Sequence, residues 1–165
     1  MIVTLTGFMG SGKTTVGKVL ADFLGCPFMD LDDLVVKKAG KSIPEIFAQD
    51  GEAAFRQVEA RILRQTVVKY GETTAVLALG GGAVTTPASA SLLHEKTVCI
   101  YLRATLDTLL GRLAGETSGR PLADASLADR LASREPIYEE TAHVIIDTDG
   151  LTPDEVADEI IISAL

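Results

Sequence analysis

The residues with the clearest chemical meaning form a glycine-rich segment near the start of the chain. Residues 7–14 read Gly-Phe-Met-Gly-Ser-Gly-Lys-Thr and match the pattern G-x-x-x-x-G-K-[ST] without a gap. Such glycines let the backbone curl so that successive N–H groups point into one concavity that holds phosphate oxygens. Lys13 is suited to reach the β- and γ-phosphates of a nucleotide, and the Thr14 hydroxyl is suited to bind Mg²⁺. The predicted nucleotide-binding residues of this segment are Gly10, Ser11, Gly12, Lys13, Thr14 and Thr15.

Two aspartates stand at the carboxyl end of the second predicted strand, residues 27–30. Asp30 and Asp32 alternate across Leu31, so both carboxylates can project from the carboxyl edge of a parallel sheet toward the phosphate loop. Ligands bind at this edge in open parallel sheets. A single aspartate here could simply cap the next helix, whose first turn would hold Asp33. Two aspartates at this spacing favour a functional role.

A run of three glycines, Gly80 to Gly82, ends the third predicted strand at the same edge of the sheet. Glycines allow the backbone to approach a ligand closely, because no side chain stands in the way. A merely flexible turn is the alternative. The position at the end of a strand favours a loop that contacts the substrate.

Two arginines could bind an anionic substrate, although either one alone could be a solvated surface residue. Arg56 lies early in a long predicted helix, and Glu59 stands three residues later, where it can orient the guanidinium. Arg134 lies late in another predicted helix. An arginine fork matches a carboxylate with two hydrogen bonds, which a lysine cannot do.

A third arginine, Arg120, lies in a segment without periodicity. Residues 114–126 are rich in glycine and polar side chains, and Pro121 follows Arg120 directly. Such a loop could be a flexible lid that excludes water and brings a cation onto the γ-phosphate. A surface loop without that role is equally compatible with the sequence.

The elements that must position these residues alternate between strands and helices. Predicted strands cover residues 2–6, 27–30, 75–79, 97–102 and 143–147. Predicted helices cover residues 14–24, 32–39, 52–69, 88–93, 106–113, 127–138 and 153–164, and a capping box at Ser42 and Glu45 marks a further helix start. This alternation predicts an α/β protein, a three-layer α/β/α sandwich with a five-stranded parallel sheet, as one domain over residues 1–165.

Composition and charge exclude several other classes. The net charge of −8 disfavours a nucleic-acid-binding surface, and the longest apolar runs are strand-sized and too short to span a membrane. Cys26 and Cys99 lack CxxC spacing, which favours two reduced cysteines and a cytoplasmic location. The chain contains no Asn and no Lys-x-Asp, so the base-reading motif of a guanine-specific switch is absent.

Taken together, these segments resemble the shikimate kinase family, whose fold is that of P-loop NTPases and nucleoside monophosphate kinases. The matching segments are residues 7–14, 29–32, 42–47, 51–59, 79–84, 120–122 and 134–138. Shikimate kinases transfer the γ-phosphate of ATP to the 3-hydroxyl of shikimate, with Mg²⁺, in aromatic amino-acid biosynthesis. The resemblance implies this activity and places the substrate-binding helices at about residues 31–70.

The resemblance also implies roles at the acceptor end of the site. Asp32 would hold and polarise the acceptor hydroxyl as a candidate base. Arg56 and Arg134 would grip the shikimate carboxylate, with Glu59 orienting an arginine and Gly81 supplying a backbone contact. The implied substrate-binding residues are Asp32, Phe47, Phe55, Arg56, Glu59, Gly80, Gly81, Gly82 and Arg134.

At the nucleotide end, the resemblance implies that Arg120 is the lid cation on the phosphates and that Asp30 reaches Mg²⁺ beside Thr14. Arg112 and the region of Pro153 would flank adenine. The implied catalytic residues are Lys13, Asp32 and Arg120. The sequence departs from many relatives at Leu151, in a region where they carry a basic residue just before the counterpart of Pro153.

Other functions of the same fold stay open at this point. Gluconate kinase and nucleoside monophosphate kinase share the architecture, and the former also handles a hydroxy acid. A nucleotide-binding regulatory protein without catalysis would lack the paired aspartates and the lid arginine, and both are present. We expect a monomer that binds ATP and shikimate.

Overall fold

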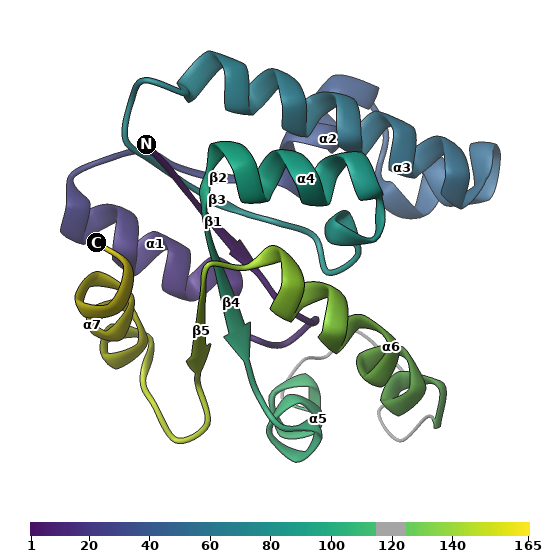
Figure 1. Ribbon diagram of the computed structural model, residues 1–165. Coiled ribbons are helices and arrows are strands. Elements are labelled where there is room, and N and C mark those ends of the chain that lie inside the picture. Colours follow the sequence, from purple (N-terminus) through teal and green to yellow (C-terminus); the bar gives the residue numbers. More distant parts are fainter. Residues whose placement is uncertain (115–124) are drawn as a thin grey trace.

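The computed structural model describes residues 1–114 and 125–165. Within these ranges, five parallel strands form one sheet in the order β2-β3-β1-β4-β5 (Figure 1). The strands are β1 (Ile2–Thr6), β2 (Phe28–Asp30), β3 (Ala75–Ala78), β4 (Val98–Arg103) and β5 (Val144–Asp147). The helices are α1 (Lys13–Leu24), α2 (Leu31–Ala39), α3 (Ile43–Tyr70), the 3₁₀ helix η1 (Ala83–Thr85), α4 (Pro87–Lys96), α5 (Leu106–Ala114), α6 (Ala125–Thr141) and α7 (Pro153–Ala164).

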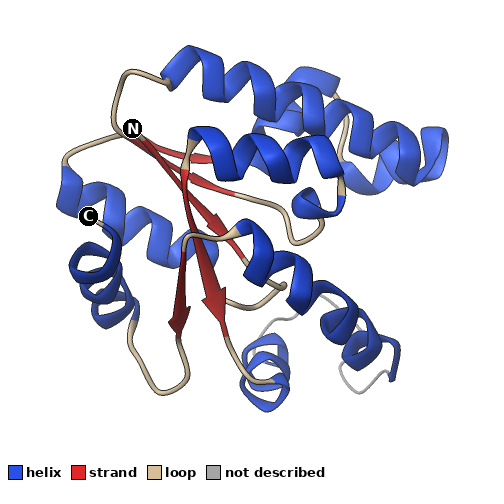
Figure 2. Ribbon diagram, viewed as in Figure 1, coloured by secondary structure: helices blue, strands red, loops and turns tan. Residues whose placement is uncertain are grey.

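Helices cover both faces of the sheet, which confirms the predicted three-layer architecture (Figure 2). On one face, α1 and α7 bury an aliphatic core against alternate strand residues such as Val3 and Leu5 of β1. On the other face, α2, α3, α4 and α6 cover a second core that contains Leu77 of β3 and Tyr101 of β4. Because successive strand residues point to opposite faces, a parallel sheet buried on both sides requires nearly continuous apolar strands.

The central strand β1 leads directly into the phosphate loop, and two glycines in this loop are required by its geometry. Gly7 has φ 147°, and a Cβ atom there would lie 2.6 Å from the carbonyl oxygen of Leu102. Gly12 has φ 92° and is the N-cap of α1. The turn therefore places the positive N-terminal end of α1 at the carboxyl edge of the sheet.

Helix α3 contains a break that was visible in the sequence. The predicted capping box is formed, since Ser42 Oγ accepts from the N–H of Glu45 at 3.3 Å and the Glu45 carboxylate accepts from the N–H of Ser42 at 3.4 Å. Gly51 then has φ 86° and ψ 170°, outside the helical region, so the element consists of two helical parts. The break brings the rings of Phe47 and Phe55 to a centroid distance of 4.9 Å.

The observed helices differ from the predicted ones mainly at their ends. Helix α4 begins at Pro87, a favoured first position, and continues to Lys96. Helix α6 continues through Pro136 to Thr141. The part of the chain that the structure describes holds no helix with both the length and the apolar character that a bilayer crossing requires.

The packing of α1 on β2 depends on the absence of a side chain at Gly17. A Cβ atom there would lie 3.0 Å from Cδ1 of Phe28 and 3.3 Å from Cδ1 of Leu5. We expect Gly17→Ala to lower the free energy of unfolding by about 1–3 kcal/mol, because it overpacks this contact. Gly111 of α5 has open space around it, so Gly111→Ala is expected to raise the free energy of unfolding by up to ~1 kcal/mol. Urea denaturation checks both variants, and equal stability of the two would contradict the packing argument.

Candidate functional site

Lys13 lies within the phosphate loop and is held by the backbone of that loop. Its Nζ donates to the carbonyl oxygens of Gly7 at 2.5 Å and Phe8 at 3.1 Å. Burial of the ammonium lowers the pKa of Lys13 to about 8, although the carboxylates of Asp32 and Asp30 act to raise it. Lys13 is therefore a cation in a partly desolvated position, where an approaching anion gains more than it would in water.

Asp30 performs two tasks at the end of β2. Its Oδ1 accepts from the backbone N–H of Asp32 at 2.9 Å, so it is the N-cap of α2. Its Oδ2 accepts from the Thr14 hydroxyl at 3.1 Å. Asp30 therefore caps α2 and also contacts the phosphate loop, as the sequence analysis predicted. Two oxygen side chains at the end of a phosphate loop fit Mg²⁺, which prefers oxygen ligands.

A cavity of ≈ 450 Å³ opens between the phosphate loop, α2, α3, the segment after β3 and α6. Every residue that the sequence analysis assigned to substrate binding lines it. The lining residues are Met9, Asp32, Ile43, Phe47, Glu52, Phe55, Arg56, Glu59, Gly80, Gly81, Gly82, Arg130 and Arg134. Residues scattered from position 9 to position 134 thus meet in one place.

The Arg56 guanidinium is oriented by a buried carboxylate, as its spacing predicted. Nη1 of Arg56 donates to Oε1 of Glu59 at 2.8 Å, and the Glu59 side chain is only 2% exposed. Burial raises the pKa of Glu59, while the hydrogen bond from Arg56 acts in the opposite direction. Nε of Arg56 and Oε2 of Glu59 are buried and have no hydrogen-bond partner within the described ranges. Both atoms belong to side chains that line the cavity.

None of the three glycines after β3 has a positive φ, and two of them, Gly80 and Gly82, are needed for space. A Cβ atom at Gly80 would lie 2.9 Å from Oδ1 of Asp32 and 3.2 Å from Oε2 of Glu59. A Cβ atom at Gly82 would lie 2.7 Å from Cζ of Arg56. The glycine segment, Gly80 to Gly82, therefore lets the backbone pass directly beside these charged groups.

Asp32 is the carboxylate at the centre of this arrangement. Burial is the main cause that raises its pKa, and the negative charge of Asp30 acts in the same direction. The cations Lys13 and Arg56 act to lower the pKa. An aspartate with a raised pKa beside two cations is better suited to accept a proton than an exposed aspartate.

Arg134, on α6, packs against the phosphate loop. Its guanidinium lies over the ring of Phe8, with Cζ 5.9 Å from the ring centroid. Nη1 would lie 3.5 Å from a Cβ atom at Gly81, so Arg134 also borders the glycine segment. The structure thus gathers Lys13, Asp32, Arg56 and Arg134 at one edge of the sheet. Arg120 and most of the predicted lid, residues 114–126, lie outside the described residues.

A second, smaller cavity of ≈ 210 Å³ lies at the start of α1. Its lining residues are Ser11, Gly12, Thr15, Val16, Arg112, Thr148, Leu151, Pro153 and Val156. Arg112 is fixed there, because Nη1 donates to the carbonyl oxygen of Gly10 at 3.2 Å and Nη2 donates to that of Thr148 at 3.3 Å. The structure therefore brings Thr15, Arg112 and Pro153 together, next to the phosphate loop.

Some lining residues were missed by sequence reasoning. Arg130 precedes Arg134 by one helical turn, and Glu52 precedes Arg56 by one turn and lies 3.6 Å from it. That spacing is a signal that could have found them. Met9 had no such signal, because its position in the phosphate-loop pattern accepts any residue.

Comparison with known proteins gives a consistent result. The family model described as shikimate kinase matches residues 9–164. The shikimate kinase of Enterococcus faecalis is 42% identical, covering 96% of this chain and 95% of that protein. The shikimate kinase of Geobacter sulfurreducens is 44% identical over 96% of this chain and 87% of its own.

Solved structures agree with the sequence relatives. The shikimate kinase of Acinetobacter baumannii in complex with shikimate superposes with a TM-score of 0.85 at 33% identity, covering 97% of this chain and 90% of that chain. The shikimate kinase of Aquifex aeolicus gives a TM-score of 0.87 at 31% identity, covering 99% of this chain and 95% of its own.

The lowered pKa of Lys13 predicts a pH dependence of phosphate binding. In the free protein Lys13 loses its charge as the pH rises through about 8, so the affinity for ATP is expected to fall above that pH. Titration calorimetry with ATP between pH 6.5 and 9.5 measures this loss. In Lys13→Met the affinity is expected to be low throughout, without the step near pH 8. A step of equal size in that variant would assign the titration to another group.

Proposed function

The chain belongs to the shikimate kinase family, and we propose that it transfers the γ-phosphate of ATP to the 3-hydroxyl of shikimate, giving shikimate 3-phosphate and ADP. The strongest support for this proposal is the arrangement of three side chains. Arg56, Arg134 and Asp32 line a single cavity whose wall includes Met9 of the phosphate loop. A carboxylate-bearing alcohol bound there would present its hydroxyl to a nucleotide held by that loop.

The two arginines match the carboxylate of the substrate. A guanidinium binds a carboxylate through charge-assisted hydrogen bonds, which are roughly twice as strong as neutral ones. Glu59 fixes Arg56 from behind, so less side-chain freedom is lost when the substrate binds.

Asp32 is the group we assign to the acceptor hydroxyl. It would accept a hydrogen bond from the hydroxyl, hold the oxygen in line with the γ-phosphate, and receive its proton as the bond to phosphorus forms. Its raised pKa suits this exchange, since a base works best when its pKa approaches the pH at which it acts. Positioning supplies much of the acceleration in phosphoryl transfer.

At the nucleotide end, we assign the phosphates to Lys13 and to the backbone N–H groups at the start of α1. Thr14 and Asp30 would hold Mg²⁺, which when bound neutralises phosphate charge. Arg112, Thr15 and Pro153 line the cavity that would receive the adenine side of ATP. Arg120 stays a prediction from the sequence, as the cation that covers the phosphates when a lid closes.

Two further assignments concern the chain as a whole. We propose that residues 1–165 form one kinase domain, with α2 and α3 as the substrate-binding helices. Cys26 and Cys99 are both free thiols, which supports the proposed cytoplasmic location. The monomeric state stays a prediction.

A coupled assay of ADP release tests the reaction directly. Shikimate, gluconate and CMP are offered side by side with ATP and Mg²⁺. We expect kcat/KM for shikimate to exceed that for the other two by at least about 100-fold, because a site built for specific polar groups rejects ligands that leave them unpaired. A preference for gluconate or CMP would refute the proposed acceptor and support one of the related kinases.

The role of Asp32 is tested by Asp32→Asn. This change keeps the shape of the side chain but removes the base, so the turnover number is expected to fall by about 10²–10⁴-fold while ATP binding stays intact. Asp33→Asn is the matched control, because Asp33 is an exposed first-turn residue of the same helix. The control is expected to change turnover less than about 2-fold. Full activity of Asp32→Asn would eliminate the assigned role.

A further inference from the structure

Tyr138 makes a contact that none of the roles above uses. It is fully buried, and its ring lies 5.0 Å from that of Tyr101, centroid to centroid. Its hydroxyl donates a hydrogen bond to the carbonyl oxygen of Gly81. Burial raises the pKa of Tyr138 to about 12, so the hydroxyl keeps its proton at any physiological pH. The contact joins the glycine segment to α6, the helix that carries Arg134 one turn earlier.

This hydrogen bond fixes the orientation of a peptide unit inside the site. The carbonyl of Gly81 and the N–H of Gly82 belong to the same planar, trans peptide, so they point in opposite directions. Holding the carbonyl toward Tyr138 therefore turns the N–H of Gly82 away from Tyr138. Three consecutive glycines have no side chains to anchor them and retain large conformational freedom. An external hydrogen bond removes part of that freedom.

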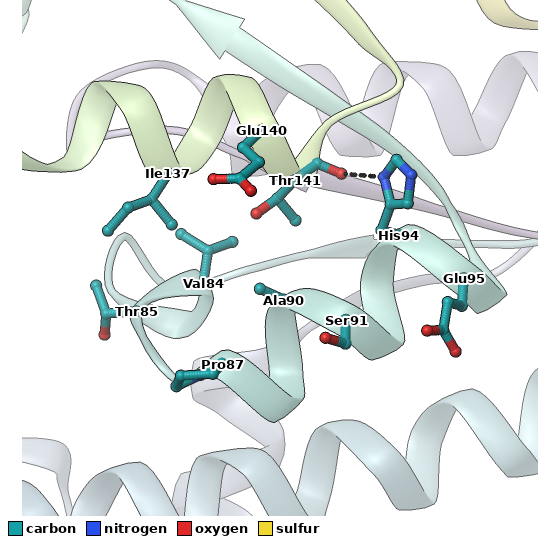
Figure 3. Close-up of a pocket in the computed structure, with 10 residues that line it drawn as sticks. All are labelled: Val84, Thr85, Pro87, Ala90, Ser91, His94, Glu95, Ile137, Glu140 and Thr141. Atoms are coloured by element: carbon teal, nitrogen blue, oxygen red, sulfur yellow. Dashed lines mark hydrogen bonds between the residues drawn. The ribbon is translucent and has the colours of Figure 1, made fainter.

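A pocket lies beside the contact between Tyr138 and Gly81, on the side that faces α4. Figure 3 shows a pocket between η1, α4 and the end of α6, with a volume of ≈ 510 Å³. Val84 and Thr85, which follow the glycine segment, line one wall, and Ile137 and Thr141, which flank Tyr138, line another. The pocket is bridged at α4, where Nδ1 of His94 bonds the carbonyl oxygen of Thr141 at 3.1 Å (Figure 3).

From these contacts we propose that Tyr138 is a positioning residue, which sets the glycine segment at the correct distance from Arg134 and Arg56 for binding of the shikimate carboxylate. The inference rests on the proposed function of the cavity. Gly81 borders Arg134, and Gly82 leaves room for the Arg56 guanidinium. A shift of the glycine segment would therefore disturb both arginines at once. The nucleotide cavity does not contain Tyr138 or the glycine segment.

Tyr138→Phe tests this role, because it removes the hydroxyl and keeps the ring. We expect KM for shikimate to rise about tenfold, the effect of one buried hydrogen bond, with the turnover number and KM for ATP changed less than about 2-fold. Calorimetry should show the same loss in the Kd of shikimate. Tyr101→Phe is the matched control, since the Tyr101 ring packs on Tyr138 but its hydroxyl makes no hydrogen bond within the described ranges. It is expected to leave both KM values unchanged.

Three outcomes would overturn the inference. The first is an unchanged KM for shikimate in Tyr138→Phe. The second is an equal rise in both KM values together with a lower Tm, which would make Tyr138 a purely structural residue. The third is the same effect in Tyr101→Phe. The wild-type chain is assayed first: if it does not phosphorylate shikimate, the proposed function fails, whereas an active wild type with unaltered Tyr138→Phe kinetics refutes only the role of Tyr138.

Discussion

The site depends on mutual neutralisation of charges that are removed from water. Lys13, Arg56 and Arg134 share one edge of the sheet with Asp32 and Glu59, and the pKa of Glu59 responds to both arginines. An isolated charge in such a place would cost several kcal/mol, so each cation must have a carboxylate near it. The two carboxylates then serve different ends: Glu59 holds Arg56 before the substrate arrives, and Asp32, whose pKa is raised by burial and by the charge of Asp30, can accept a proton.

Charges can approach this closely only because the backbone between them lacks side chains. Gly80 passes beside Asp32 and Glu59, and Gly82 passes beside Arg56. Gly7 serves the phosphate loop in a similar way, since a side chain there would strike the backbone of Leu102. The glycines of this protein therefore act through the absence of a side chain as well as through unusual backbone angles: Gly80 and Gly82 provide space alone, whereas Gly7 does both.

Much of the fold followed from local sequence patterns. Strand and helix periodicity, the capping box at Ser42 and the phosphate-loop pattern each determine structure over a few residues, and each prediction was confirmed. The assignment of Asp32, Arg56 and Arg134 to one cavity combined strand-end position with a family resemblance. The contact between Tyr138 and Gly81 could not be predicted in this way, because its partners are far apart in sequence and no local pattern marks either as the partner of the other.

A protein with a net charge of −8 can bind two anionic substrates, because binding depends on the charge inside the cavity and less on the charge of the whole chain. Arg56, Arg130 and Arg134 line the same small cavity, and Lys13 lies in the adjoining phosphate loop. In a partly desolvated cavity a cation attracts an anion more strongly than at an exposed surface, because water and salt screen the pair less. The acidic exterior can therefore keep the protein from binding polyanions, while the recessed cations remain available to ligands small enough to enter. Selectivity for small anions then follows from where the positive charge is buried, since the total charge would repel them.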